Sequence, residues 1–123
     1  AKKYEQEIKK LPNNIKKVIY MPTKKKFLFN TFWLYNIRIK SLTEKNRNKL
    51  MINLNNKGIE TRNFFYPLNK MKIYKKYLNS GDNFSVCNKI AESGLCLPSS
   101  PNLKFSEIEF IVKQLSKEIL KVI

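Results

Sequence analysis

The sequence contains no histidine, only three glycines and a single aspartate, Asp82, in 123 residues. Without histidine, the chain cannot supply a Ser-His or Cys-His nucleophile pair, an imidazole proton shuttle, or a zinc site that includes histidine. Gly58, Gly81 and Gly94 are scattered, so they form neither a dinucleotide-binding turn nor a phosphate-binding glycine-rich loop. If the chain belongs to an enzyme, we expect most of the catalytic residues to lie outside it.

Cysteine and long apolar runs are also scarce. Cys87 and Cys96 are too few for a disulfide scaffold, and on one helix they would lie about 13 Å apart. They predict reduced thiols and a cytoplasmic protein. The longest apolar stretch, residues 27–35, is interrupted by Asn30 and Thr31 and is much shorter than the roughly 20 residues of a membrane span. The charged N-terminal segment predicts no secretory signal.

Positive charge is abundant, because 25 Lys+Arg against 9 Asp+Glu give a formal net charge of +16. Such a charge favours binding to polyanions without any motif. However, 22 of the cations are lysines, and only three are arginines, whose guanidinium groups read phosphates and base edges. Together with fifteen Asn and thirteen Ile, the lysine excess indicates the codon usage of an AT-rich genome. A free-standing basic module that binds RNA or another polyanion through lysines and aromatic residues 64–66 remains the alternative.

The periodicity of apolar residues predicts the order of elements within a single domain, residues 1–123. Helices are expected at residues 2–11, 84–93 and 106–123, and between Thr43 as N-cap and Gly58 as a left-handed C-terminal residue. Alternation predicts strands at residues 27–39 and 59–66. This order predicts an α+β fold, with a small, largely antiparallel sheet of about two to four strands covered on one face by helices.

Several local features are also predicted from the sequence. A capping box of Ser106 and Glu109 is expected to start the last helix, which would turn Leu120 and Ile123 inward. Residues 70–78 are expected to form a short helical turn, and the helix at 84–93 is expected to bury Val86 and Ile90. The lysine run at residues 24–26 predicts a solvated loop, with an anion-binding loop as the alternative.

The most informative stretch, GIETRNFFYPLNKMKIY at residues 58–74, combines an arginine, three consecutive aromatics, a proline and an asparagine at the end of a predicted strand. Phe64 and Phe65 are predicted to be core residues. Arg62 alternates with aromatic residues, so it is expected to form either a structural ion pair or a contact to an anionic group. Tyr66 and Asn69 could donate hydrogen bonds to a hydroxylated ligand or be ordinary turn residues.

At this stretch the chain resembles the C-terminal domain of the DegT/DnrJ/StrS family, pyridoxal-phosphate-dependent aminotransferases that act on nucleotide-linked keto sugars. The family pattern GI-x-TR-x-FFYPLH is matched by GIETRNFFYPLN at residues 58–69. The segments IAESGLCLPSSPNL at 90–103 and FSEIEFIVKQL at 105–115 follow in the family's order. The chain differs from the pattern at Asn69, where the family has histidine, and at Lys72, where it has proline.

The resemblance implies the small C-terminal domain of a fold-type I aminotransferase, with the large pyridoxal-phosphate-binding domain absent from this chain. It implies that this domain is inactive alone and binds no cofactor by itself. The parent enzyme would be a homodimer that transfers an amino group, from glutamate, to a nucleotide-linked keto sugar for polysaccharide biosynthesis. Carried over by position, Arg62, Tyr66 and Asn69 are the candidate substrate-binding residues. The large domain could belong to the same chain or to a separate subunit.

Overall fold

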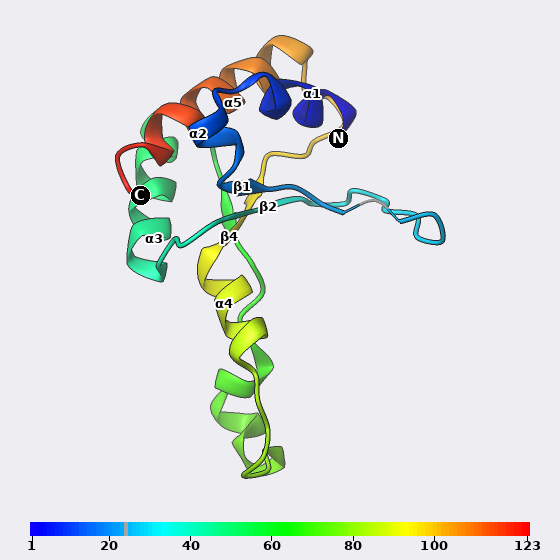
Figure 1. Cartoon of the computed structure of the whole chain (residues 1–123), viewed down its shortest axis with the longest axis vertical. Coiled ribbons are helices and arrows are strands. Elements are labelled where there is room, and N and C mark those ends of the chain that lie inside the picture. Colours follow the sequence, from blue (N-terminus) through cyan, green and yellow to red (C-terminus); the bar gives the residue numbers. More distant parts are fainter. Residues whose placement is uncertain (24) are drawn as a thin grey trace.

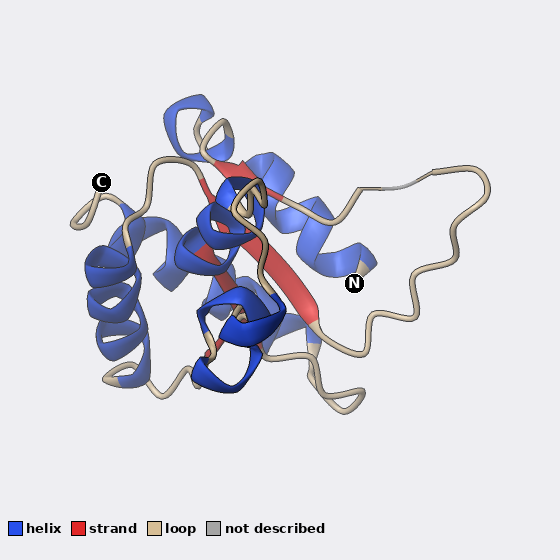
Figure 2. Ribbon diagram, turned by 90° about the horizontal axis from the view of Figure 1, so that it is seen from below, coloured by secondary structure: helices blue, strands red, loops and turns tan. Residues whose placement is uncertain are grey.

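The computed structural model describes residues 1–23 and 25–123, which form a sheet, a set of helices and two projecting segments (Figures 1 and 2). In chain order the elements are α1 (Lys2–Lys10), α2 (Asn13–Lys16), β1 (Ile19–Tyr20), β2 (Tyr35–Ile39), α3 (Glu44–Asn55), β3 (Arg62–Asn63), the 3₁₀ helices η1 (Leu68–Lys70) and η2 (Lys72–Tyr77), α4 (Ser85–Ser93), β4 (Gly94–Leu97) and α5 (Phe105–Ile119). Among the described residues, no helix is long and apolar enough to cross a bilayer.

The four strands form one antiparallel sheet in the order β1-β2-β4-β3. The central pair is β2 and β4, in which Tyr35 lies opposite Leu97 and Ile37 opposite Leu95. The α+β fold predicted from the sequence, with a small antiparallel sheet, is therefore confirmed.

The hydrophobic core lies between one face of this sheet and the helices α1, α3 and α5 (Figure 1). Alternate residues of β2 point into the core, as the period of two in a strand requires. The largest side chains that are fully buried are Tyr4, Ile8, Ile15, Tyr35, Ile37, Ile39, Leu50, Leu54, Leu95, Leu115 and Ile119.

Both ends of α3 are as predicted. The Thr43 hydroxyl accepts a hydrogen bond from the backbone N–H of Asn46 at 3.2 Å, which satisfies one of the free donors of the first turn. After the helix, Gly58 has φ +75°, and the N–H of Ile59 donates to the carbonyl of Leu54. A left-handed glycine is the usual way to close such a helix end.

The predicted capping box at the start of α5 is wrong by two residues. Lys104 is the N-cap, and its backbone N–H donates to Oε2 of Glu107 at 2.6 Å, so Glu107 replaces the predicted Glu109 as the capping carboxylate. Ser106 lies inside the first turn. At the other end, Leu120 and Ile123 are exposed instead of buried, because the helix ends at Ile119.

The predicted strand at residues 27–39 is also too long, because only Tyr35–Ile39 is paired. The chain turns at Phe32, which has φ +53° and whose N–H donates to the side-chain oxygen of Asn30 at 2.8 Å. The partner strand β4 has only four residues, which lie opposite Tyr35 to Arg38, so it offers no partner to residues 27–34. As a consequence, Phe27 and Phe29 are 81% and 92% exposed.

Around α4 the sequence predicted the helix but not its environment. The predicted strand at 59–66 is reduced to Arg62–Asn63, and the central strand β4 was not predicted at all. Val86 is 70% exposed and Ile90 37% exposed, so both inward assignments are wrong. The helical turn expected at 70–78 is present as η2.

Two segments project from the body of the molecule (Figure 1). One is the connection between β1 and β2, in which Lys25 and Lys26 are exposed, whereas Lys24 of the predicted loop lies outside the described residues. The other comprises residues 64–93 and contains η1, η2 and α4. We call residues 64–93 the arm.

Candidate functional site

The face of the sheet that the core helices leave open meets the arm in a groove of about 720 Å³. Asn36 and Cys96 of the sheet form its floor, Trp33 borders it on the β1–β2 connection, and Phe84 and Val86 border it on the arm. The groove is predominantly apolar, and large apolar side chains along it are not covered: Trp33 is 75% exposed. An exposed apolar groove of this size is typical of a binding surface.

The two cysteines both lie along this groove and are free, in agreement with the reduced thiols predicted. Cys87 is exposed on α4, whereas Cys96 is buried in β4 with its thiol 3.7 Å from the carbonyl oxygen of Asn63. Burial raises the pKa of the Cys96 thiol, and the nearby Arg62 guanidinium opposes that rise. Cys96 is therefore a neutral thiol on the groove floor.

Arg62 lies on the edge strand β3, where it borders both the groove and a second cavity of about 410 Å³ that also includes Ser99 and Ser100. Its guanidinium lies 3.4 Å from the carboxylate of Glu60, and both side chains are about three-quarters exposed. An exposed ion pair with this geometry contributes little to the stability of the fold. The guanidinium thus remains accessible to an anionic group that enters either cavity.

The other two predicted site residues lie on the arm. Tyr66 is exposed and lines a separate cavity of about 220 Å³ at the base of the arm. The Asn69 side-chain amide donates a hydrogen bond to the side-chain oxygen of Asn88 at 3.1 Å. The structure thus does not bring Arg62, Tyr66 and Asn69 together in one cavity, and their role in substrate binding stays a prediction.

The two phenylalanines between these residues differ. Phe64 is half-buried and its ring lies directly over Gly94, where an added Cβ would come within 2.5 Å of two ring carbons. Phe65 is 76% exposed and lines the groove, so the prediction that it is a core residue is wrong. Gly94, which has no side chain, allows β4 to pass beneath the ring of Phe64.

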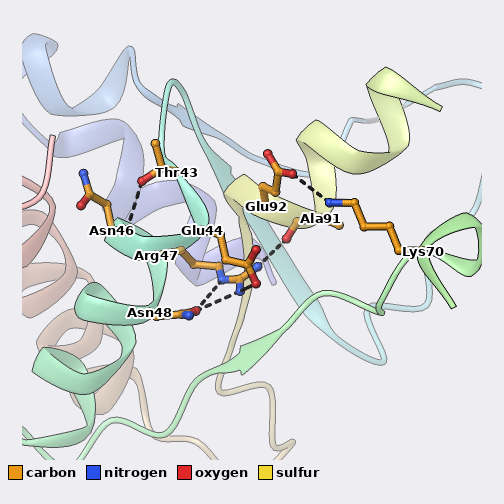
Figure 3. Close-up of polar contacts among 8 residues, drawn as sticks. All are labelled: Thr43, Glu44, Asn46, Arg47, Asn48, Lys70, Ala91 and Glu92. Carbon is orange, nitrogen blue, oxygen red and sulfur yellow. Dashed lines mark hydrogen bonds and ion pairs between the residues drawn. The ribbon is translucent and has the colours of Figure 1, made fainter. Parts of the chain in front are cut away.

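Arg47 is a buried, hydrogen-bonded residue that was not among the predicted site residues. It is 5% exposed, and its guanidinium donates to the carbonyl oxygen of Ala91 at 2.6 Å and to the side-chain oxygen of Asn48 (Figure 3). Nearby, the Lys70 ammonium group pairs with Glu92 at 3.0 Å (Figure 3). A signal was available, since a helical residue three positions from the buried Leu50 faces the same side.

None of the described lysines fits the attachment site of pyridoxal phosphate. A lysine that forms a Schiff base needs a buried position that lowers its pKa. Every described lysine is exposed or half-buried. For Lys3 and Lys70, hydrogen bonds to carboxylates instead raise the pKa. No cluster of metal-ligating side chains occurs among the residues that the structure describes.

The antiparallel sheet with helices on one face and a groove on the other is the fold of a region of solved sugar aminotransferases. The sugar aminotransferase Spr1654 from Streptococcus pneumoniae, in its PMP form, superposes with a TM-score of 0.81 at 19% identity, over 99% of this chain and 29% of that protein. An aminotransferase from Brucella abortus gives a TM-score of 0.72 at 19% identity, over 94% of this chain and 30% of that protein. At this identity the likeness shows the fold alone.

The model of the DegT/DnrJ/EryC1/StrS aminotransferase family matches residues 1–116, and the chain belongs to this family. GDP-perosamine synthase from Vibrio cholerae is 34% identical over 83 residues, which are 68% of this chain and 22% of that protein. GDP-perosamine synthase from Escherichia coli O157:H7 is 29% identical over 105 residues, or 85% of this chain and 27% of that protein. The chain thus spans less than a third of the length of these relatives. The resemblance seen in the sequence is confirmed.

Proposed function

We propose that this chain is the small, substrate-cleft domain of a pyridoxal-phosphate-dependent sugar aminotransferase. The parent enzyme would act in the cytoplasm and transfer an amino group, from glutamate, to a nucleotide-linked keto sugar used for polysaccharide biosynthesis. The observation that carries the proposal is the family match over residues 1–116 in a chain that spans less than a third of its relatives. The proposed activity therefore belongs to an assembly of this domain with a large cofactor-binding domain.

The open groove is consistent with the proposal that a second domain packs against this face of the sheet. Trp33, Phe65 and Val86 border the groove with most of their surface exposed. Burying such side chains against another domain is favourable by about 25 cal/mol per Å² of apolar surface. In this proposal the large domain, in the same chain or a separate subunit, lies against this face, and the complete enzyme is a homodimer.

The proposed role of this domain is to orient the substrate and exclude water, not to make or break bonds. Arg62 is suited to a phosphate of the nucleotide, because its guanidinium is accessible beside two cavities. Tyr66 and Asn69 offer a hydroxyl and an amide to sugar hydroxyls, although Asn69 would first have to leave Asn88. Pyridoxal phosphate would be held by the large domain, since the described lysines do not fit its attachment.

The location of the cofactor can be tested with the chain alone. We mix it with pyridoxal phosphate, reduce with borohydride and map the modified lysines by mass spectrometry. The expected result is scattered, substoichiometric labelling of exposed lysines. Stoichiometric labelling of one lysine would contradict the proposal that the cofactor site lies in another domain.

The role in substrate binding needs an active enzyme. We fuse the chain in frame to the large domain of a GDP-perosamine synthase and measure the KM for the nucleotide sugar. Arg62→Leu is expected to raise KM roughly tenfold or more, because it removes a charge-assisted contact to phosphate. The control is Arg38→Leu. It removes an arginine whose guanidinium carbon lies 4.4 Å from the centre of the Tyr20 ring. An equal effect of both variants would argue against a specific role for Arg62.

A further inference from the structure

The arm lies outside the hydrophobic core. Of residues 64–92, all of which the structure describes, only Pro67 is buried. Apolar side chains along the arm, such as Ile73 and Tyr77, are about two-thirds exposed. Hydrophobic burial therefore contributes little to holding the arm at one angle to the sheet, and the polar contacts at its base become decisive.

The central contact at the base joins α3 to the end of α4. Arg47 on α3 donates from Nη1 to the carbonyl oxygen of Ala91 at 2.6 Å (Figure 3). Ala91 lies in the last turn of α4, where carbonyls have no partner within the helix. The negative end of the helix dipole also lies there, so a buried cation is favourable at this point. The contact thus completes a helix end with a group from another element.

The guanidinium of Arg47 is itself held in place. Its Nε and Nη2 atoms donate to the side-chain oxygen of Asn48 at 3.2 and 2.9 Å, and Glu44 lies 3.4 Å away. A second tie, the Lys70–Glu92 ion pair at 3.0 Å, joins η1 to the same turn of α4. That pair lies wholly within the arm, so it stiffens the arm without attaching it to α3. Arg47 is therefore a fixed, buried polar link between the core and the arm.

We propose that Arg47 is a positioning residue that sets the angle of the arm and thereby the width of the groove. The arm forms one wall of the groove through Phe84, Val86 and Ile90, and the β1–β2 connection borders the other side. Loss of the guanidinium leaves the carbonyl of Ala91 without its donor and frees α4 to move. This inference does not depend on what the groove binds.

The chain carries its own probes for the test. Trp33, the single tryptophan, borders the groove on the β1–β2 connection, and Cys87 is an exposed thiol on the opposite wall. In a Cys96→Ala background, an acceptor dye on Cys87 reports the width of the groove by energy transfer from Trp33. Hydrogen exchange of α4 and α5 amides is followed in parallel.

Arg47→Leu is expected to lower the transfer efficiency and to speed α4 amide exchange by about tenfold or more, with α5 exchange unchanged. Arg47→Lys keeps the positive charge but loses the planar guanidinium with its several donors. It should therefore restore part of the transfer efficiency and part of the protection of α4 amides. The matched control is Lys49→Leu, an exposed cation on the same helix, which should change neither.

Equal effects of Arg47→Leu and Lys49→Leu would overturn the proposal. So would faster exchange in α4 and α5 alike, since this would show that Arg47 only supports the stability of the whole domain. If Arg47→Leu does not fold, the same two measurements are made on Arg47→Lys. Energy transfer and α4 amide exchange equal to those of the wild type would then reject a positioning role.

Discussion

At the scale of single residues, two buried tyrosines stack in the core and differ in one respect. The rings of Tyr4 and Tyr35 lie 4.5 Å apart at 20°. The Tyr4 hydroxyl donates to the carbonyl oxygen of Pro98 at 2.8 Å, whereas the buried Tyr35 hydroxyl has no hydrogen-bond partner among the residues that the structure describes. Burial raises the pKa of both phenols, so both stay neutral through the physiological range.

Removing each hydroxyl should therefore have opposite effects on the free energy of unfolding. Tyr4→Phe is expected to destabilise the domain by about 0.5–1.5 kcal/mol, because it removes a satisfied hydrogen bond. Tyr35→Phe is expected to be neutral or to stabilise by up to about 1 kcal/mol, since it removes an unsatisfied polar group. Urea unfolding of the two variants measures the difference, and each serves as the control of the other. Equal destabilisation would contradict the assigned hydrogen bond.

Gly94 offers a second test at this scale. Gly94→Ala is expected to destabilise the domain by about 1–3 kcal/mol, because the added Cβ would overlap the ring of Phe64. The control is Gly81→Ala, where an added Cβ meets no atom within 4 Å. Phe64→Leu should relieve part of the overlap, so the double variant Gly94→Ala/Phe64→Leu should lose less than the two single losses added together. Strict additivity, measured by urea unfolding, would show that the ring is not the obstacle.

The role of a single residue can be predicted from the sequence when neighbouring residues determine it, and not when a contact distant in the sequence does. Thr43 and Gly58 could be assigned because a helix N-cap and a left-handed C-terminal glycine are set by neighbouring backbone atoms. Gly94 and Arg47 depend on Phe64 and Ala91, which lie 30 and 44 positions away. No local pattern encodes such contacts. The exposure of Phe65 could not be predicted for the same reason, because it depends on the arm projecting from the sheet at residue 64.

At the scale of elements, α5 and α3 are joined by a buried carboxylate. Glu118 on α5 is 2% exposed and accepts hydrogen bonds from the side-chain amide of Asn53 on α3 at 2.9 Å and from Lys121 at 2.7 Å. These bonds, that of Lys121 first, lower the pKa of Glu118. The folded protein thus binds a proton at this site less readily than the unfolded chain does.

The lowered pKa of Glu118 predicts a pH-dependent contribution to stability. The contribution is present above about pH 4.5, the ordinary value for Glu, and is lost as the pH falls below it through the folded pKa. Glu118→Gln should therefore be less stable than wild type at pH 7, with the difference shrinking below pH 4.5 because wild-type Glu118 becomes protonated. Thermal unfolding from pH 3 to 7 measures this. Glu60→Gln, at an exposed side chain, is the control and should show no such convergence.

The helices were predictable as elements, whereas the sheet was predictable only in kind. A helix closes its hydrogen bonds within one segment, so α1, α3, α4 and α5 leave a periodic signal in the sequence. A strand depends on its partner. The four residues of β4 are too few to show alternation, and residues 27–34 alternate without finding a strand to pair with. Pairing between distant segments therefore decided the length of β2.

At the scale of the whole molecule, the groove carries little of the chain's positive charge. The chain has 25 basic and 9 acidic side chains, so the basic side chains outnumber the acidic ones by 16. Yet among the described residues that line the groove, Arg62 is the one cation. The family pattern at residues 58–69 singled out Arg62 as a candidate residue, but the groove that Arg62 lines is formed by segments that only the fold brings together. The low positive charge of this aromatic groove also bears on the alternative of RNA binding.

A module for single-stranded RNA combines a basic groove with aromatic side chains on which bases stack. Because the aromatic groove here contains one cation, we expect lysine-driven RNA binding that is weak near 0.15 M salt and falls steeply as salt rises. Fluorescence anisotropy of a labelled oligouridine, titrated from about 0.02 to 0.3 M NaCl, measures this. Trp33→Ala should leave the affinity unchanged, since no base stacks on the ring. Tight binding at 0.15 M that Trp33→Ala weakens tenfold or more would instead favour a basic RNA-binding module, because stacking contributes about 1–3 kcal/mol per base.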